Sequence, residues 1–331
     1  MEVRVLEYFL AVARERSISG AAEALHLTQP TLSRQIKELE DELGKTLVIR
    51  GSRRITLTEE GMLLRKRAEE IVSLVRRTRD EVMCSAEDVS GDVYIGAGET
   101  RGMSILADIM TEIRRENPGV RFHTVSGDSA DIMERLDKGL FDFCLIMGNV
   151  DISRYNSLRL PVTDDFGLLM RRDSPLAVKE YITPEDLDGI PVMFSRQVLI
   201  RDDLADWLGK PTTDLDLAGS YNLTYNASIM AKAGLAHIVT LDGLINTEGS
   251  ELVFRPFSPR FPIGMSVIWK KYQVFSRPAE LFLERLRERI AALLDHLAAN
   301  FPQITSLFYI VNTKFNDSVG DLDPVCYKGK D

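Results

Sequence analysis

The stretch from Thr28 to Gly44 limits the fold more than any other part of this 331-residue chain, because it contains both ends and the buried face of one helix. Thr28 suits an N-cap, and Pro30 suits the first turn, where its missing N–H group leaves no unpaired donor. Apolar residues then recur every three or four positions as far as Leu43, and Gly44 is well suited to end a helix. The outer face of the predicted helix carries polar side chains: Gln29, Thr31, Ser33, Arg34 and Lys37.

Two shorter helices are predicted before this one, over residues 2–14 and 20–25, with Ser19 as the cap of the second. Two short helices in close succession, the second with amides, hydroxyls and bases near its start, are typical of a helix-turn-helix, here over residues 18–37. Glutamine can bond adenine and arginine can bond guanine in the major groove, and Pro30 lies beside them in the first turn. Spacing alone leaves open an ordinary antiparallel helix pair with a polar outer face.

Residues 46–58 are rich in β-forming residues around a Gly-Ser turn and predict a hairpin that acts as a wing. Its tip carries arginines that could contact the DNA backbone or the minor groove: Arg50, Arg53 and Arg54. From residue 59 to 88 the pattern predicts a long helix with an apolar face too narrow to fold alone. We expect this helix to be a linker through which two chains dimerise.

The net charge of −9, from 41 Lys and Arg against 50 Asp and Glu, would argue against nucleic acid if it were spread evenly. Nine bases and only four acids lie between Arg50 and Arg79, however, and residues 1–88 are almost neutral. The acidity therefore belongs mainly to the larger C-terminal part. A near-neutral N-terminal region with a basic segment can contact phosphates while the whole chain stays acidic.

Short motifs follow one another in a fixed order over the first 61 residues: Phe9 to Ala13, Ser19-x-Ala21-Ala22-x-x-Leu25, Thr28-Gln29-Pro30-x-Leu32-Ser33-x-x-Ile36-x-x-Leu39-Glu40-x-x-Leu43-Gly44, and Leu57-Thr58-Glu59-x-Gly61. In this order and spacing they resemble the DNA-binding domain of LysR-type transcriptional regulators. This resemblance favours a helix-turn-helix that binds the major groove over an ordinary antiparallel helix pair. One departure is Val48, where the family usually has Phe. Val48 is a core position, so the residues that would face DNA are unaffected.

The resemblance implies a sequence-specific transcriptional regulator. It implies a homodimer or tetramer that binds a dyad-symmetric operator in double-stranded DNA through residues 29–37 and the wing arginines. A small-molecule effector, and RNA polymerase as a further partner, follow from the same resemblance.

From residue 92 onward, predicted strands alternate with predicted helices, which is typical of a doubly wound parallel α/β sheet. The chain leaves one α/β unit, builds a second and then returns, as periplasmic-binding-protein-like folds do. LysR-type regulators carry an effector domain of this kind, so the resemblance extends at the level of pattern to about residue 300. In the predicted order of domains, the α/β effector domain follows an all-α-type winged helix-turn-helix domain.

The expected domains are the winged helix-turn-helix at 1–58, the linker helix at 59–88, the effector domain at 89–300 and a disordered tail at 301–331. Within the effector domain, lobe I is expected at about 92–161 and 267–300, and lobe II at about 162–266.

Polar residues follow the predicted strands of both lobes, and we expect them to line a cleft: Thr100, Arg101, Ser126, Gly148 and Asn149 from lobe I, with Ser195 and Arg196 from lobe II. Hydroxyls, helix N-terminal amides and two arginines would suit a small anionic ligand such as a carboxylate. The family's effector contacts commonly come from the positions of Thr100, Ser126 and Ser195. Glu99 departs from this pattern and could pair with Arg101 or Arg196. A cleft wall with internally paired charges is the alternative.

One motif favours a different class of protein. Gly96-x-Gly98-x-x-x-Gly102 follows a strand and opens a helix, as dinucleotide-binding loops do. The acidic residue that should end the second strand is missing, and the spacing is off by one residue. The alternative left open is a small-molecule-binding protein, or a dinucleotide-dependent enzyme, with an N-terminal domain that only oligomerises.

Nothing else in the sequence favours catalysis. No GxSxG, HExxH or P-loop motif occurs, the four histidines are scattered and the three cysteines lie far apart, so we expect no enzyme, no metal site and no cofactor. Cys144 is expected to be a small buried residue. No apolar run reaches the ~18–20 residues that span a bilayer, and the N-terminus lacks the apolar stretch of a signal peptide. We therefore expect a cytoplasmic protein with no membrane partner.

Overall fold

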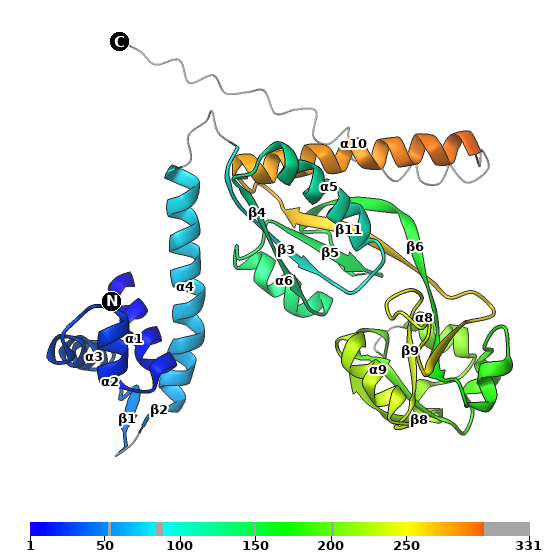
Figure 1. The fold of residues 1–331 in the computed structure, drawn as a ribbon, viewed down its shortest axis with the longest axis horizontal. Coiled ribbons are helices and arrows are strands. Elements are labelled where there is room, and N and C mark those ends of the chain that lie inside the picture. The colour runs from blue at the N-terminus through cyan, green and yellow to red at the C-terminus, as the bar shows by residue number, and fades with distance from the viewer. Residues whose placement is uncertain (52–53, 84–88, 149, 200–201, 301–331) are drawn as a thin grey trace, which may run out of the picture. The chain divides into compact units, whose positions relative to one another are not determined.

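The computed structural model describes residues 1–300 except 52–53, 84–88, 149 and 200–201 (Figure 1). Arg53, Asn149 and the 301–331 tail therefore lie outside the described residues. The chain divides into two compact units, Met1–Ser85 and Ala86–Asp331, which are taken one at a time below.

The N-terminal unit contains four helices and a hairpin in its described part: α1 (Val3–Glu15), α2 (Ile18–Ala24), α3 (Gln29–Leu43), β1 (Val48–Arg50), β2 (Ile55–Leu57) and α4 (Glu59–Met83). The prediction for α3 is confirmed at both ends: Thr28 accepts a hydrogen bond from the backbone N–H of Thr31, and Gly44 has a φ of 63°. The cap of α2 was predicted wrongly. Ser17, not Ser19, accepts from the N–H of Gly20, since Ile18 must enter the helix to be buried.

Three helices and the hairpin of this unit share one core. The predicted stripe of α3 supplies Leu32, Ile36 and Leu39, which pack with Phe9 and Val12 of α1. Val48, the departure from the family motif, is buried in the same cluster. Glu40, on the same helix, accepts hydrogen bonds from the backbone N–H groups of Leu47 and Val48 at 2.7 and 3.0 Å, which attaches the wing to α3.

The apolar residues of the long helix α4 are partly buried and partly exposed. Ala68 and Val72 are buried against Leu6 of α1, so one side holds the helix to its own unit. Leu64 and Ile71 are half-buried in the same contact, whereas five further apolar residues are 42–79% exposed: Met62, Leu63, Leu74, Val75 and Val82. At about 100° per residue these five spread over more than half of the circumference of the helix, with Leu63 and Leu74 close to one line.

The described part of the C-terminal unit contains strands β3 (Gly91–Ala97), β4 (Val120–Ser126), β5 (Phe143–Met147), β6 (Tyr155–Arg171), β7 (Pro191–Ser195), β8 (Asp216–Tyr221), β9 (His237–Leu241), β10 (Leu252–Pro256) and β11 (Pro262–Lys270). Its helices are α5 (Met103–Glu116), α6 (Ser129–Asp137), α7 (Arg196–Leu199), α8 (Asp202–Leu208), α9 (Thr224–Lys232) and α10 (Arg277–Asn300). A short 3-10 turn covers Pro184–Leu187.

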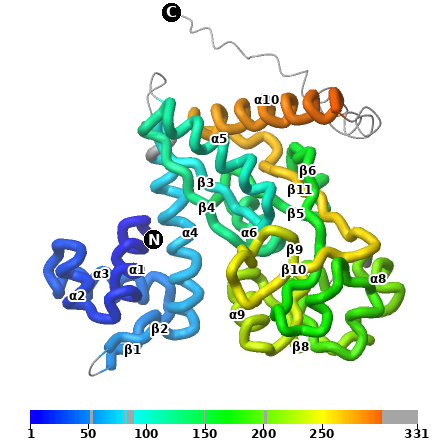
Figure 2. The backbone as a smooth tube through the Cα atoms, turned by 45° about the vertical axis from the view of Figure 1, so that its right-hand side comes forward, coloured from blue at the N-terminus to red at the C-terminus, as the bar shows by residue number. Residues whose placement is uncertain are grey.

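The sheet of this unit is mixed, which corrects the expectation of a purely parallel one. The strand order is β4-β3-β5-β11-β6-β9-β7-β8, with β10 on β6. The parallel pairs lie at the two ends, β3 with β4 and β5, and β7 with β8 and β9. Between them β6 and β11 run antiparallel to each other and pass side by side from one lobe into the other (Figures 1 and 2).

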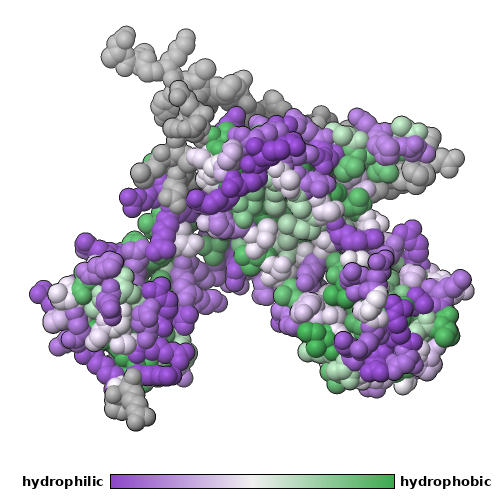
Figure 3. All heavy atoms as spheres, viewed as in Figure 1, coloured by the Kyte–Doolittle hydropathy of each residue, from purple (hydrophilic) through white to green (hydrophobic). Residues whose placement is uncertain are grey.

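Each lobe has its own core on these two long strands. Along β6 the side chains pass from the lobe I core at Leu160 to the lobe II core at Phe166. Along β11 the change falls between Ile263 and Met265. Alternate residues of β5 face α5 and α10 on one side and α6 on the other, so helices cover both faces as expected. Hydrophilic side chains cover most of the visible surface of each unit (Figure 3).

Gly61 on α4 tests the packing of the N-terminal unit. A Cβ at this position would collide with the backbone carbonyl of Leu47, which cannot move without shifting the wing. We expect Gly61→Ala to lower the free energy of unfolding of this unit by about 1–3 kcal/mol. Hydrogen exchange of the α3 and α4 amides in the full chain measures the change.

Gly20 on α2 is the matched control, since a Cβ there would meet its neighbours at 3.6 Å or more. Gly20→Ala should leave stability unchanged or raise it by up to about 1 kcal/mol. Equal exchange rates in Gly61→Ala and Gly20→Ala would contradict the close approach of α4 to the wing.

Candidate functional site

The outer face of α3 presents the polar residues that the sequence pattern predicted for DNA. Gln29, Pro30, Thr31, Arg34 and Lys37 are exposed. Ser33 is half-buried and accepts a hydrogen bond at 3.1 Å from the guanidinium of Arg50 on β1. The wing is thereby joined to the start of α3, with Arg54 also exposed.

Sequence reasoning missed a residue on this face. Glu38 accepts hydrogen bonds from the guanidinium of Arg34 and from the side-chain amide of Gln35, each at 2.7 Å. The hydrogen bond between Arg34 and Glu38, together with the negative charge of Glu38, raises the pKa of Arg34. The i,i+4 spacing of Arg34 and Glu38 on a helix was the signal that could have revealed the pair.

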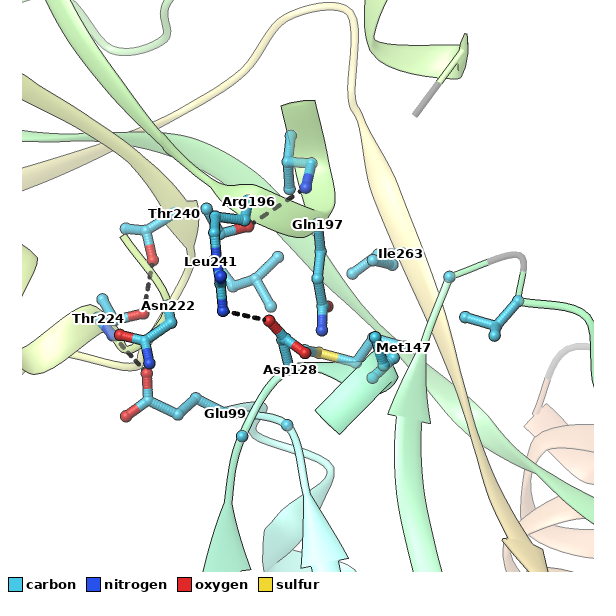
Figure 4. Close-up of a pocket in the computed structure, with 18 of the residues that line it drawn as sticks. Glu99, Asp128, Met147, Arg196, Gln197, Asn222, Thr224, Thr240, Leu241 and Ile263 are labelled. Atoms are coloured by element: carbon cyan, nitrogen blue, oxygen red, sulfur yellow. Dashed lines mark hydrogen bonds and ion pairs between the residues drawn. The ribbon is translucent and has the colours of Figure 1, made fainter. Parts of the chain in front are cut away.

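The second candidate site is a cavity of about 830 Å³ between the two lobes of the C-terminal unit (Figure 4). Of the residues predicted to line a cleft, Gly148, Ser195 and Arg196 do line it. Thr100, Arg101 and Ser126 are not among its lining residues, and Asn149 lies outside the described residues.

Thr100 and Arg101 serve a different purpose in this structure. Thr100 is 6% exposed, and its hydroxyl donates to the buried carboxylate of Asp164 on β6 at 2.5 Å. The backbone N–H of Arg101 donates to the same carboxylate at 3.0 Å, and its guanidinium reaches both Asp164 and Asp242 at 3.3 Å. These groups join the end of β3 to the strand that crosses between the lobes. Ser126 ends β4 and is exposed.

Two bonds cross the cavity from one lobe to the other. Arg196 of lobe II donates to Asp128 of lobe I at 2.7 Å. Glu99 of lobe I accepts from the backbone N–H of Thr224, the first residue of α9 in lobe II, at 2.5 Å. Figure 4 shows both bonds beside the open space. The expectation that Glu99 pairs with Arg101 or Arg196 is therefore wrong, because those arginines bind aspartates and Glu99 binds a helix N-terminus.

The charge of the cavity wall differs in sign from the predicted one. Five carboxylates line it, and Arg196 is the single base among the lining residues that the structure describes. The carboxylates are Glu99, Asp128, Asp151, Asp203 and Asp206. Sequence reasoning missed all of these but Glu99: Asp128 comes two residues after the end of β4, and the last three follow no predicted strand end.

Other chemistry finds little support in the described residues. Within them, no three His, Cys, Asp or Glu side chains gather closely enough to hold a metal ion. Among the described helices, none is long and apolar enough to cross a bilayer. Cys144 is fully buried on β5, and burial raises the pKa of its thiol to about 12.

The fold and the two sites define a class of protein: a winged helix-turn-helix domain joined to a two-lobed α/β domain with a cavity between its lobes. Comparison with known families agrees. The sequence model for bacterial regulatory helix-turn-helix proteins of the lysR family matches residues 3–62, and that for the LysR substrate binding domain matches residues 86–291. The chain belongs to the LysR family of transcriptional regulators.

Individual relatives support the assignment. The hydrogen peroxide-inducible genes activator of Dickeya chrysanthemi is 33% identical over 190 residues, which are 57% of this chain and 62% of that protein. The regulator IlvY of Escherichia coli is 30% identical over 215 residues, 62% of this chain and 70% of that one. Crystalline CbnR, a LysR family regulator, shares the fold with a TM-score of 0.69 and 20% identity, over 88% of this chain and 99% of CbnR.

The buried thiol of Cys144 gives a test of the C-terminal core. We expect iodoacetamide at pH 8 to modify Cys144 at least a hundredfold more slowly in the folded chain than in urea, because only the thiolate reacts and its pKa is raised from 9.0 to about 12. Mass spectrometry of a Cys84→Ser, Cys326→Ser variant measures the rate at Cys144 alone. A rate in the folded chain equal to that in urea would contradict the burial of β5.

Proposed function

We propose that this protein regulates transcription by binding a dyad-symmetric operator in double-stranded DNA through α3 and the wing. The observation that carries the proposal is the division of α3 into two faces. One face, with Leu32, Ile36 and Leu39, is completely buried, while the other presents Gln29 and Arg34 to solvent on a helix held rigidly by its caps. A rigid helix with exposed amide and guanidinium donors suits the major groove.

The remaining DNA contacts in this proposal come from hydroxyls and bases around that face. Thr31, Ser33 and Lys37 would hold phosphates or base edges at the start of α3, where Pro30 offers an apolar ring to its neighbours. Arg50 and Arg54, with Arg53 between them in the sequence, would bind the backbone or the minor groove beside the wing. The exposure of Arg54 and the bond from Arg50 to Ser33 support this arrangement.

Reading a symmetric operator requires two copies of α3 related by a two-fold axis. The exposed apolar residues of α4 support a homodimer, since five large apolar side chains on one helix would otherwise face water. Two such helices could bury these side chains against each other. A tetramer through the C-terminal units, RNA polymerase as a further partner, and a cytoplasmic location complete the proposal.

The cavity between the lobes is the proposed effector site. Its volume lies within the range of small-molecule sites in proteins. Since β6 and β11 join the lobes, a ligand that contacts both could change the angle between them and so the geometry of the dimer.

A relative named for hydrogen peroxide raises the question of a redox effector. In this chain Cys144, the one cysteine within the described residues, is buried with a raised pKa, so its thiol lacks the thiolate that peroxide requires. These properties favour a bound small molecule as the effector over oxidation of Cys144.

The alternative interpretation as a dinucleotide-dependent enzyme rested on three glycines, and their packing in the structure argues against it. A Cβ on Gly96 would lie 2.8 Å from the ring of Phe141, and one on Gly98 would lie 2.7 Å from Met147. A Cβ on Gly102 would overlap the sulfur of Met265. Internal packing explains all three glycines, with no need for a phosphate.

Arg34 tests the proposed reading of bases. We expect Arg34→Ala to lower the affinity for the operator by about 1–3 kcal/mol relative to a scrambled sequence. Arg54→Ala, the matched control, should weaken all sequences alike and reduce the dependence on salt. Gel-shift titration with the DNA upstream of the protein's own gene measures both. An unchanged operator affinity in Arg34→Ala would show that α3 does not read the operator.

Leu74 tests the proposed dimer contact of α4. Leu74→Glu places a charge among the exposed apolar residues of α4 and should weaken self-association about tenfold or more. Ser73→Glu adds the same charge one residue away, at an exposed polar position, and should leave association unchanged. Light scattering of the full chain across a dilution series compares them. If both variants associate like the parent protein, α4 is not the contact.

A further inference from the structure

We propose that the cavity between the lobes binds an organic cation, a protonated amine carried on an apolar body, in place of the carboxylate that the sequence pattern favoured. This inference rests on the proposed effector site and names the class of ligand it takes.

The first observation is that the two arginines predicted to bind an anion, and the N-terminus of α9, already contact carboxylates of the protein. The N-terminal amide of α9 donates a hydrogen bond to the carboxylate of Glu99, and the guanidinium of Arg196 donates one to Asp128. Arg101, the second predicted anion ligand, is bound by Asp164 and Asp242 outside the cavity lining. The protein itself supplies a carboxylate to each of these positions. An anionic ligand would have to displace one of them.

The second observation is the sign of the charged residues along the wall. Besides Glu99 and Asp128, the wall carries Asp151, from the segment between β5 and β6, and Asp203 and Asp206, from α8. Arg196 is the single base among the described lining residues. Inside a cleft, where less water screens the charges than on an open surface, these carboxylates attract a cation and repel an anion.

The arrangement of the carboxylates favours an organic cation over a metal ion. A divalent metal needs several oxygen ligands within about 2–2.6 Å of one point. No described residues form such a group, and the five carboxylates come from both lobes and from separate segments. A protonated amine needs only one or two acceptors at hydrogen-bond distance, so it suits carboxylates that are spread out.

The rest of the wall suits an apolar body. Met133, Met147 and Val150 line the cavity from lobe I, and Phe166, Leu244 and Ile263 line it from lobe II. Methionine side chains adapt to varied apolar shapes and pack well against rings. A volume of about 830 Å³ leaves room for a ring or chain together with its amine.

A pair of probes of equal shape and opposite charge tests the sign. Phenethylamine and 3-phenylpropionate are titrated into the full chain by calorimetry at low ionic strength. We expect the amine to bind, the carboxylate not to bind, and the affinity for the amine to fall as salt is added. Binding of the carboxylate alone, or of neither probe in the millimolar range, would overturn the inference.

Variants then locate the interaction. Asp206 is exposed on α8, so Asp206→Asn removes a charge at little cost to the fold. We expect Asp206→Asn, alone or with Asp203→Asn, to weaken amine binding about tenfold. Glu284→Gln on α10 is the matched control, since it removes an exposed carboxylate outside the cavity lining, and it should leave binding unchanged. Equal affinities in all variants, or equal losses in Asp206→Asn and Glu284→Gln, would overturn the assignment to the cavity.

A gel-shift assay on the same preparations separates this inference from the proposed function. Operator binding without amine binding rejects the amine and leaves the regulator intact. Amine binding without any operator binding supports the ligand class while rejecting the proposed function.

Discussion

The buried carboxylate of Asp164 is the interaction on which the two-lobed unit depends. It lies on β6, between the residues that enter the core of lobe I and those that enter the core of lobe II. A carboxylate that is 2% exposed is stable only when it is well paired, and here it receives the hydroxyl of Thr100 together with the backbone N–H and guanidinium of Arg101. The end of β3 and the crossing strand are thus held together beside the cavity.

The two units differ in their local charge. Bases are concentrated from the wing into α4, where the proposed partner is a polyanion. Carboxylates are concentrated in the cavity, where they occupy the anion-binding groups of the opposite lobe and leave a negative wall. The net charge of −9 alone reveals neither of these local concentrations of charge. Opposite local charges in one chain allow DNA and a small cation to be bound without competing for the same groups.

Local patterns predicted the N-terminal unit well, because its signals are short-range. The cap at Thr28, the spacing of Leu32, Ile36 and Leu39, and the terminal Gly44 all act within one helix, and each is found as expected. The cap of α2 was misplaced by two residues, from Ser17 to Ser19, because both are good caps and only the burial of Ile18 distinguishes them. The parallel direction of β3, β4 and β5 was likewise predicted from the alternation of strands and helices, and it is found in the structure.

Local patterns were enough to predict that a winged helix-turn-helix precedes an α/β domain, since caps, helix periodicity and strand alternation are local properties. Three features came from the packed fold alone: β6 and β11 pair antiparallel through both lobes, Thr100 and Arg101 hold Asp164, and Glu99 binds the N-terminus of α9. The hydrogen bond from Thr100 to Asp164 joins residues 64 positions apart, and the bond from the backbone N–H of Thr224 to Glu99 joins residues 125 positions apart. No local pattern records such pairings, because they depend on how separate elements pack.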